Sequence, residues 1–273
     1  MIRMINLENE ISKVLKSINP KEYPEMFEFL EEQLEDEAFG EDDIFDIAAT
    51  IAELDAPKPF PNVVIKFITM LYEHEIDKGN AAAMNNLGSQ YYDGNRGFEQ
   101  SFPKAVELYK MAAENGDRQA QENLGYCYYY GRDMEPDYEK AFQYFAMGAF
   151  DGHLISLYKI GDMYLNGYYV PKNEKEAFII YMHCLDTMTD EAAPKVAGPV
   201  YLRLGKMFLN GTGTEKNLSS ALVCYQKAEA YLYDMVKGGD YMYKKSLLGA
   251  IEGQEKTRRE MMEQLPEREW EFD

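Results

Sequence analysis

The residues of this chain best suited to chemistry are three histidines and three cysteines, and their spacing supports none. His74, His153 and His183 lie far apart and form no metal-ligand pair. The stretch "YEHEIDK" around His74 has the glutamate of a zinc-protease helix but lacks the second histidine. We therefore expect ordinary surface or boundary histidines and no metal.

The cysteines and serines do not suggest catalysis either. Cys127, Cys184 and Cys224 are odd in number and widely spaced, so they predict neither a disulfide framework nor a zinc site. The sequence has no G-x-S-x-G nucleophile motif and no phosphate-binding glycine loop. Neighbouring carboxylates near the N-terminus are better explained as a solvated helix face. We therefore expect no enzyme activity and no cofactor, and we expect the reduced cytoplasm as the compartment.

The charge of the chain narrows the classes of partner. The 273 residues carry a formal net charge of −20. Such a surface repels nucleic acids and anionic lipids, and it favours a basic protein or peptide. The alternative is that the acidic residues only keep an elongated protein soluble. No apolar stretch reaches the length of a signal peptide or a membrane span.

One residue pattern recurs four times in the middle of the chain, and its elements must position any binding residues. A large apolar residue precedes a glycine, an aromatic residue follows three positions later, and a second glycine stands six positions after the first. The first glycines are Gly88, Gly125, Gly161 and Gly205, at intervals of 37, 36 and 44 residues. An alanine and, four positions on, an aromatic residue follow in every copy. This regularity indicates a structural repeat.

Each copy predicts two helices. Ala83, Leu87 and Tyr91 are spaced to share one face of the first helix. Its first glycine indicates a close helix contact, and its second suits a left-handed helix stop. The second helix follows a preferred N-cap residue in each copy, namely Ser101, Asp137, Asn173 or Asn217. Because so small a unit cannot bury its own apolar face, the units must stack.

These signals predict an array over residues 61–240. It comprises a degenerate half unit at 62–79 and complete units at about 80–116, 117–152, 153–196 and 197–239. The longer last interval indicates an insertion within 186–199, as a lengthened helix, a longer loop or both.

The motifs resemble the Sel-one-like repeat family, which is related to the tetratricopeptide repeats. The best matches are "AMNNLGSQYYDG" with "KAVELYKMAAENG", and "AQENLGYCYYYG" with "KAFQYFAMGAFDG". Later copies depart, since Ser156 and Val200 replace the leading alanine. The resemblance covers about residues 62–239. It implies an all-α fold, a right-handed α-solenoid of stacked antiparallel helix pairs, and adaptor or scaffold roles typical of bacterial proteins.

The resemblance also implies where a partner would bind. In tetratricopeptide arrays the first helices line the concave face, and contacts come from fixed offsets around the Leu-Gly pair. Here the implied partner-binding residues are Asn85, Ser89, Tyr92, Asp93, Glu122, Tyr126, Tyr129, Tyr130, Tyr158, Asp162 and Lys206. Leu165, Asn166, Leu202, Leu209 and Asn210 occupy the remaining offsets. The tyrosines offer contact area, and the acidic residues would select lysine or arginine. Alternatively, individual tyrosines pack between repeats.

The two ends of the chain predict helical caps. Residues 1–60 contain three helical patterns, and residues 22–55 hold fourteen acidic residues without lysine or arginine. We interpret this segment as an acidic N-terminal cap, or alternatively as a patch for a basic partner. Residues 241–273 predict a closing helix from Tyr241 and a tail. In that tail Trp270 and Phe272 pack on a neighbouring surface, remain disordered or dock on a second molecule.

The favoured hypothesis is a non-enzymatic interaction module that binds a basic protein or peptide through a tyrosine-rich, acidic groove. An acidic inhibitor of a basic toxin, in the manner of an antitoxin or immunity protein, is the second hypothesis. A small-ligand or enzymatic groove is the third, and it would require convergent polar groups. Lys206 is the only basic residue among the implied contacts, which argues against a clamp for a terminal carboxylate.

Overall fold

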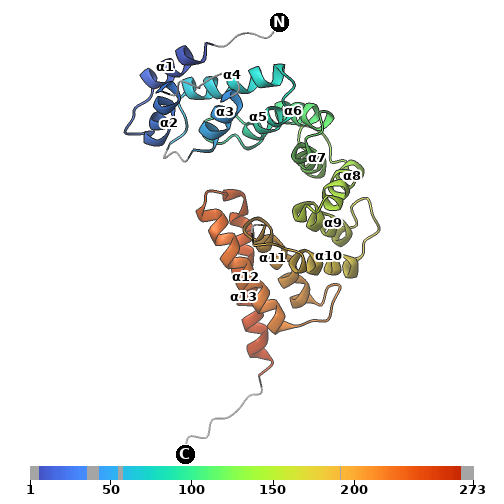
Figure 1. Cartoon of the computed structure of the whole chain (residues 1–273). Helices are drawn as coiled ribbons and strands as arrows, with labels where there is room; N and C mark the ends of the chain where they lie inside the picture. The colour runs from blue at the N-terminus through green and yellow to red at the C-terminus, as the bar shows by residue number, and fades with distance from the viewer. Residues whose placement is uncertain (1–5, 36–42, 55–57, 191, 266–273) are drawn as a thin grey trace, which may run out of the picture. The chain divides into compact units, whose positions relative to one another are not determined.

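The computed structural model describes residues 6–35, 43–54, 58–190 and 192–265. Every regular element in these ranges is helical (Figure 1). The chain divides into two compact parts, residues 1–137 and 138–273. The predictions for Trp270 and Phe272 lie outside the described residues.

The N-terminal part packs its first four helices around one apolar core. These are α1 (Leu7–Ser17), α2 (Pro24–Glu35), α3 (Ile44–Glu53) and α4 (Asn62–Asp77). Ile11, Leu30 and Ile68 are fully buried in this core. The repeat helices α5 (Ala81–Asp93), α6 (Phe102–Glu114) and α7 (Arg118–Tyr130) follow. Because α3 packs against α4, the expected half unit has a helix partner inside the expected cap.

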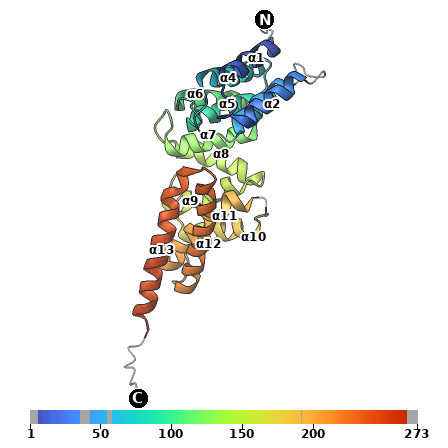
Figure 2. The same ribbon diagram turned by 90° about the vertical axis from the view of Figure 1, so that its left-hand side faces the viewer.

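The C-terminal part contains the later repeats and the closing helix. Its elements are α8 (Tyr138–Phe150), α9 (Leu154–Asn166), α10 (Glu174–Asp186), α11 (Ala193–Asn210), α12 (Leu218–Lys237) and α13 (Lys244–Glu263). Helices α11, α12 and α13 lie side by side (Figures 1 and 2). The closing helix begins at Lys244, because Tyr241–Tyr243 form a separate 3₁₀ turn.

The first glycine of a repeat makes room for an aromatic ring. The pairs are Gly88 with Tyr109, Gly161 with Tyr181, and Gly205 with Tyr225. A Cβ atom at these glycines would come within 2.6 to 2.9 Å of the ring. Such a contact is closer than a packed interior tolerates. The close approach predicted from the sequence is therefore confirmed, and its partner is the second helix of the same repeat.

The second glycine of each repeat ends the first helix in the left-handed conformation, as predicted. The φ angles are 63° at Gly94, 65° at Gly131, 73° at Gly167 and 70° at Gly211. The N–H of the following N-cap residue donates to the carbonyl of the aromatic residue in the first helix. These bonds join Ser101 to Tyr91, Asp137 to Tyr128, Asn173 to Tyr164 and Asn217 to Phe208, at 2.8 to 2.9 Å. A backbone hydrogen bond therefore closes the loop that follows each first helix.

The predicted N-cap side chains make the expected capping hydrogen bonds only in part. Asn173 and Asn217 accept hydrogen bonds from backbone N–H groups in the first turn of α10 and α12. The side chain of Ser101 makes no capping bond. Ser101 therefore acts through its backbone.

The insertion between the last two repeats is both a loop and a longer helix. Helix α10 ends at Asp186 and α11 starts at Ala193. Helix α11 has 18 residues, whereas α5, α7 and α9 have 13 each. Pro199 lies inside α11, and its carbonyl accepts a hydrogen bond from Arg203 at 2.8 Å.

Candidate functional site

Four of the predicted contact tyrosines lie near the ends of α5 and α7. Tyr92 is on α5, and Tyr126, Tyr129 and Tyr130 are on α7; we call these four residues the tyrosine cluster. The rings of Tyr126 and Tyr130 stack at 6.2 Å, and Tyr129 meets Tyr130 edge-on at 4.9 Å. Tyr130 is 47% exposed. The cluster therefore presents aromatic surface to solvent.

Arg132 contacts tyrosines of the cluster on both helices, Tyr92 on α5 and Tyr130 on α7. Its guanidinium carbon lies 5.7 Å from the ring centre of Tyr92, 5.6 Å from Tyr130 and 4.6 Å from Phe102. Its Nε also donates a hydrogen bond of 3.3 Å to the Tyr92 hydroxyl. Burial raises the pKa of Tyr92, while Arg132 opposes that rise. The cluster thus holds one guanidinium of its own chain by cation–π contacts.

Sequence reasoning missed Arg132. It follows the stop glycine Gly131, and the offsets implied by the family resemblance end at Tyr130. The available signal was a lone arginine directly after three consecutive tyrosines and a glycine.

The polar residues expected beside the cluster lie in different environments. Asp93 is exposed at the end of α5. The half-buried Ser89 accepts a hydrogen bond from the Tyr109 hydroxyl at 3.2 Å. Asn85 is buried and accepts a bond of 2.9 Å from the Asn123 amide, and Glu122 is also buried. Asn85 and Glu122 therefore face the interior rather than the expected surface, because their side chains are enclosed where the helices pack.

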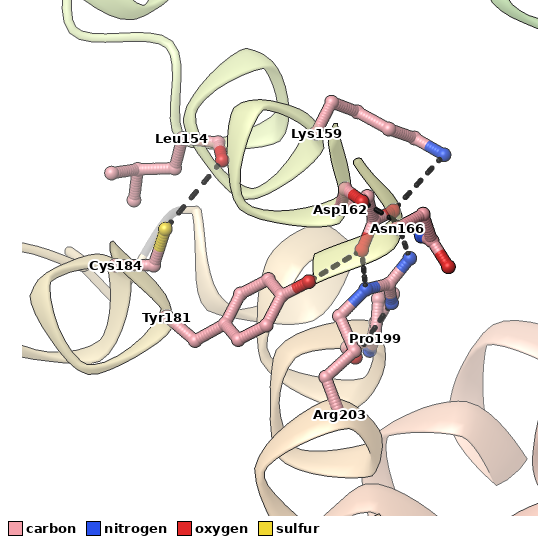
Figure 3. A network of polar contacts seen from close by, with 8 residues as sticks. All are labelled: Leu154, Lys159, Asp162, Asn166, Tyr181, Cys184, Pro199 and Arg203. Atoms are coloured by element: carbon pink, nitrogen blue, oxygen red, sulfur yellow. Dashed lines mark hydrogen bonds and ion pairs between the residues drawn. The ribbon is translucent and has the colours of Figure 1, made fainter. Parts of the chain in front are cut away.

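Two further predicted contacts, Tyr158 and Asp162 on α9, are also buried. Asp162 accepts hydrogen bonds from Arg203 of α11 at 2.5 and 2.7 Å and from the Tyr181 hydroxyl of α10 at 2.7 Å (Figure 3). Lys159 adds an ion pair of 3.7 Å. The guanidinium of Arg203 also lies over the ring of Tyr158, 4.8 Å from its centre. Arg203, which sequence reasoning missed, explains why these groups lie inside.

The electrostatics of this network favour an ionised aspartate. Burial by itself would raise the pKa of Asp162, but the charge and hydrogen bonds of Arg203 hold it below its ordinary value. Lys159 and the Tyr181 hydroxyl act in the same direction. The carboxylate of Asp162 therefore links α9, α10 and α11 through hydrogen bonds and ion pairs.

Lys206 lies elsewhere, in a groove between α11 and α13. The groove has a volume of about 680 Å³, and Tyr225 of α12 also lines it. All four implied offsets of the last repeat line it, namely Leu202, Lys206, Leu209 and Asn210. The opposite wall comes from α13, including Lys245, Leu248 and Lys256. The offsets of the last repeat thus coincide with a concave surface.

The histidine and cysteine side chains with the potential for chemistry lie in places that do not favour it. His74 is 4% exposed, so the expectation of a surface or boundary position was wrong; it lies among the buried residues of α4. Burial raises the pKa of the Cys127 and Cys184 thiols to about 12, which keeps them protonated at neutral pH. Within the described ranges, no group of three or more histidine, cysteine or acidic residues could hold a metal ion. No helix there has the length and apolar character to cross a membrane.

Comparisons with known proteins identify the kind of repeat. A sequence profile described as the Sel1 repeat matches residues 81–117, 118–153, 154–181 and 199–230. Protein sel-1 homolog 2 from Homo sapiens is 34% identical over 131 residues, which is 48% of this chain and 19% of that protein. An Arabidopsis thaliana protein named as the ERAD-associated E3 ubiquitin-protein ligase component HRD3B is 34% identical over 108 residues, 39% of this chain and 17% of that protein. The chain thus spans about a fifth of the length of these relatives.

A solved structure confirms the fold class. The Sel1 repeat protein from Oxalobacter formigenes superposes with a TM-score of 0.61 at 21% identity, covering 97% of this chain and 100% of that one. The all-α solenoid of antiparallel helix pairs predicted from the sequence is therefore correct. The helix pairs, each with a glycine that stops its first helix, and the matched profile lead to one assignment: the chain contains four Sel1 repeats between residues 81 and 230.

Proposed function

We propose that this protein is a non-enzymatic interaction module that binds a basic segment of a partner protein at the tyrosine cluster. The observation that carries the proposal is Arg132, whose guanidinium lies among Tyr92, Tyr130 and Phe102. Rings that accommodate one guanidinium offer suitable chemistry for another. The exposed carboxylate of Asp93, on the same helix as Tyr92, adds attraction for a cation.

The relatives support the class of function. Sel1 repeats build α-solenoids, whose extended surfaces are suited to protein partners. The HRD3B relative is by its name a component of a ubiquitin-ligase assembly. We extend to this chain only the general role of assembling with other proteins.

The test is affinity capture from a lysate of the source cells, with the retained proteins identified by mass spectrometry. We expect Tyr126→Ala/Tyr130→Ala to lose partners that the wild type retains, because it removes a stacked pair of rings. Tyr233→Ala is the matched control, since Tyr233 is 56% exposed on α12. Circular dichroism is to check that all forms are folded.

A synthetic peptide then tests the mode of binding. The most basic segment of a retained protein should bind the wild type and the control but bind the double variant at least about tenfold more weakly, a loss of about 1.4 kcal/mol. Equal retention by the double variant contradicts a role for the tyrosine cluster.

A second candidate, an inhibitor that captures a basic protein, is favoured by α2. Five glutamates of this helix are exposed: Glu25, Glu28, Glu31, Glu32 and Glu35. If this face binds the partner, Glu28→Gln/Glu31→Gln/Glu35→Gln should abolish capture while the tyrosine variant retains it. The same capture experiment therefore separates the two candidates.

An enzymatic groove receives no support from the described residues. The groove at Lys206 is lined by lysines, apolar residues, small polar residues and a single carboxylate, that of Glu252. His153 and His183, which would have favoured catalysis, do not line it.

A further inference from the structure

The groove between α11 and α13 has a charge opposite to that of the chain. Lys206 projects from α11, and Lys245 and Lys256 line the wall formed by α13. Glu252 is the one acidic residue among the lining residues, so the three lysines leave an excess of two positive charges. The chain as a whole has a net charge of −20. The groove would therefore attract an anionic ligand, whereas most of the acidic surface would repel it.

The positive charge of the three lysines is only partly balanced. All three are exposed; Glu252 lines the groove with them, and Lys256 also lies near Glu260. Partial desolvation of its side chain lowers the pKa of Lys206, and the neighbouring charges of Arg203 and Lys245 lower it further, whereas Asp162 opposes them. Asp162 is already bound by Arg203. A carboxylate entering the groove would supply the missing negative charge.

The rest of the lining is apolar and has the dimensions of a peptide site. Leu202, Leu209 and Tyr225 form a nearly buried floor, and Leu248 on the wall is 52% exposed. A volume of about 680 Å³ lies within the range of pockets that bind a drug-sized ligand, which suits a few side chains of a peptide. A small inorganic anion would leave the apolar surface unused.

We propose that this groove binds an acidic peptide segment that carries apolar side chains. The carboxylates pair with Lys206, Lys245 and Lys256, and the apolar side chains contact Leu248 and the floor. The site lies wholly within the C-terminal part and differs from the tyrosine cluster in position and charge preference. Its success or failure is therefore independent of the function proposed above.

The structure supplies a variant that blocks the groove without weakening the fold. Gly249 lines the groove within α13, and a Cβ atom there would meet no other atom within 4 Å. Gly249→Leu should fill the groove, and helix propensity should stabilise the protein by up to about 1 kcal/mol. Circular dichroism and thermal unfolding check that this variant is folded, so that lost binding reports on the groove.

The experiment uses the full chain and three pools of bead-bound octapeptides. Each pool alternates fixed charged or polar positions with positions randomised among leucine, isoleucine, phenylalanine and tryptophan. The fixed positions are glutamate in the first pool, lysine in the second and glutamine in the third. Peptides retained by the wild type are resynthesised with a fluorescent label, and their dissociation constants are measured by polarisation.

We expect the glutamate pool to bind more tightly than the other two. Gly249→Leu and Lys206→Glu/Lys245→Glu should each weaken the selected peptides at least tenfold. Lys175→Glu/Lys237→Glu is the control, because it makes the same charge change at two exposed lysines that do not line the groove. Replacing the apolar positions by serine should also weaken binding.

Three results would overturn the proposal. One is equal or greater retention of the lysine or glutamine pool by the wild type. Another is unchanged affinity in both groove variants. The third is full displacement by millimolar inorganic phosphate together with no effect of the serine replacements, which would identify a simple anion site.

Discussion

At Asp162, one carboxylate holds three helices together. Replacing it by asparagine removes the charge that Arg203 and Lys159 share. We expect Asp162→Asn to lower the free energy of unfolding by about 3 kcal/mol, because it leaves the buried Lys159 and the half-buried Arg203 without a counter-charge. Urea denaturation measures the loss. Adding Arg203→Met should recover part of it, and an additive double variant would contradict the coupling.

The same residue sets a pH dependence with a definite sign. The pKa of Asp162 is lowered in the folded state, so its stabilisation is complete above the ordinary aspartate pKa of about 3.9. It is lost as the pH falls through the lower folded value. The stability gap between wild type and Asp162→Asn should stay constant from about pH 7 to 5 and shrink below about pH 4. Urea titrations across that range measure it, and a gap that widens in acid would contradict the assignment.

Ser156 replaces the leading alanine of its repeat, and we expect this change to lower the stability of the fold. Its hydroxyl is fully buried and has no hydrogen-bond partner among the described residues. We expect Ser156→Ala to stabilise the protein by about 1 kcal/mol, since it removes an unsatisfied polar group. Ala120 occupies the corresponding position in the preceding repeat and is also fully buried. Ala120→Ser should therefore destabilise, and thermal unfolding of both variants tests the pair.

Among the helices, the clearest contrast is between two glycines in helical segments. A Cβ atom at Gly161 would lie 2.6 Å from Tyr181, whereas at Gly249 it would meet open space. Both replacements by alanine gain helix propensity of about 1 kcal/mol. We expect Gly161→Ala to destabilise by about 1–3 kcal/mol despite that gain, because overpacking dominates. Gly249→Ala should stabilise, and a stabilised Gly161→Ala would contradict the packing argument.

The helix pairs could be predicted from the sequence because their determinants are local. Gly94 or Gly131 stops a helix through its own backbone conformation, so its role is visible at a single position. The site residues depend on distant partners. Asp162 is buried through Arg203, 41 residues away, and Tyr92 meets Arg132 from the next repeat. Lys206 occupies a repeat offset, but the opposing groove residues lie on α13, outside the repeats, so no repeat offset could indicate Lys245 and Lys256.

For the chain as a whole, the stacking of repeats implies that a destabilising substitution affects mainly the helices around it. In a repeat protein each unit contacts mainly its neighbours, so the free energy of local unfolding differs from one repeat to the next. We expect Gly161→Ala to accelerate amide hydrogen exchange in α9, α10 and α11 while leaving α1 to α4 unchanged. Exchange followed by mass spectrometry measures this. A uniform acceleration over all helices would indicate that the chain unfolds as one cooperative unit.

The backbone bond at each loop has a consequence for how such a chain diversifies. The N–H of Asn173 or Asn217 bonds a main-chain carbonyl, so the hairpin closes whatever side chains surround it. The residue two positions after the stop glycine is also left-handed, yet it is Arg96, Asp133, Tyr169 or Gly213 in successive repeats. A copied repeat can thus keep its shape while its loop accumulates new side chains. Gene duplication followed by drift at these loops would create new surfaces on an unchanged frame.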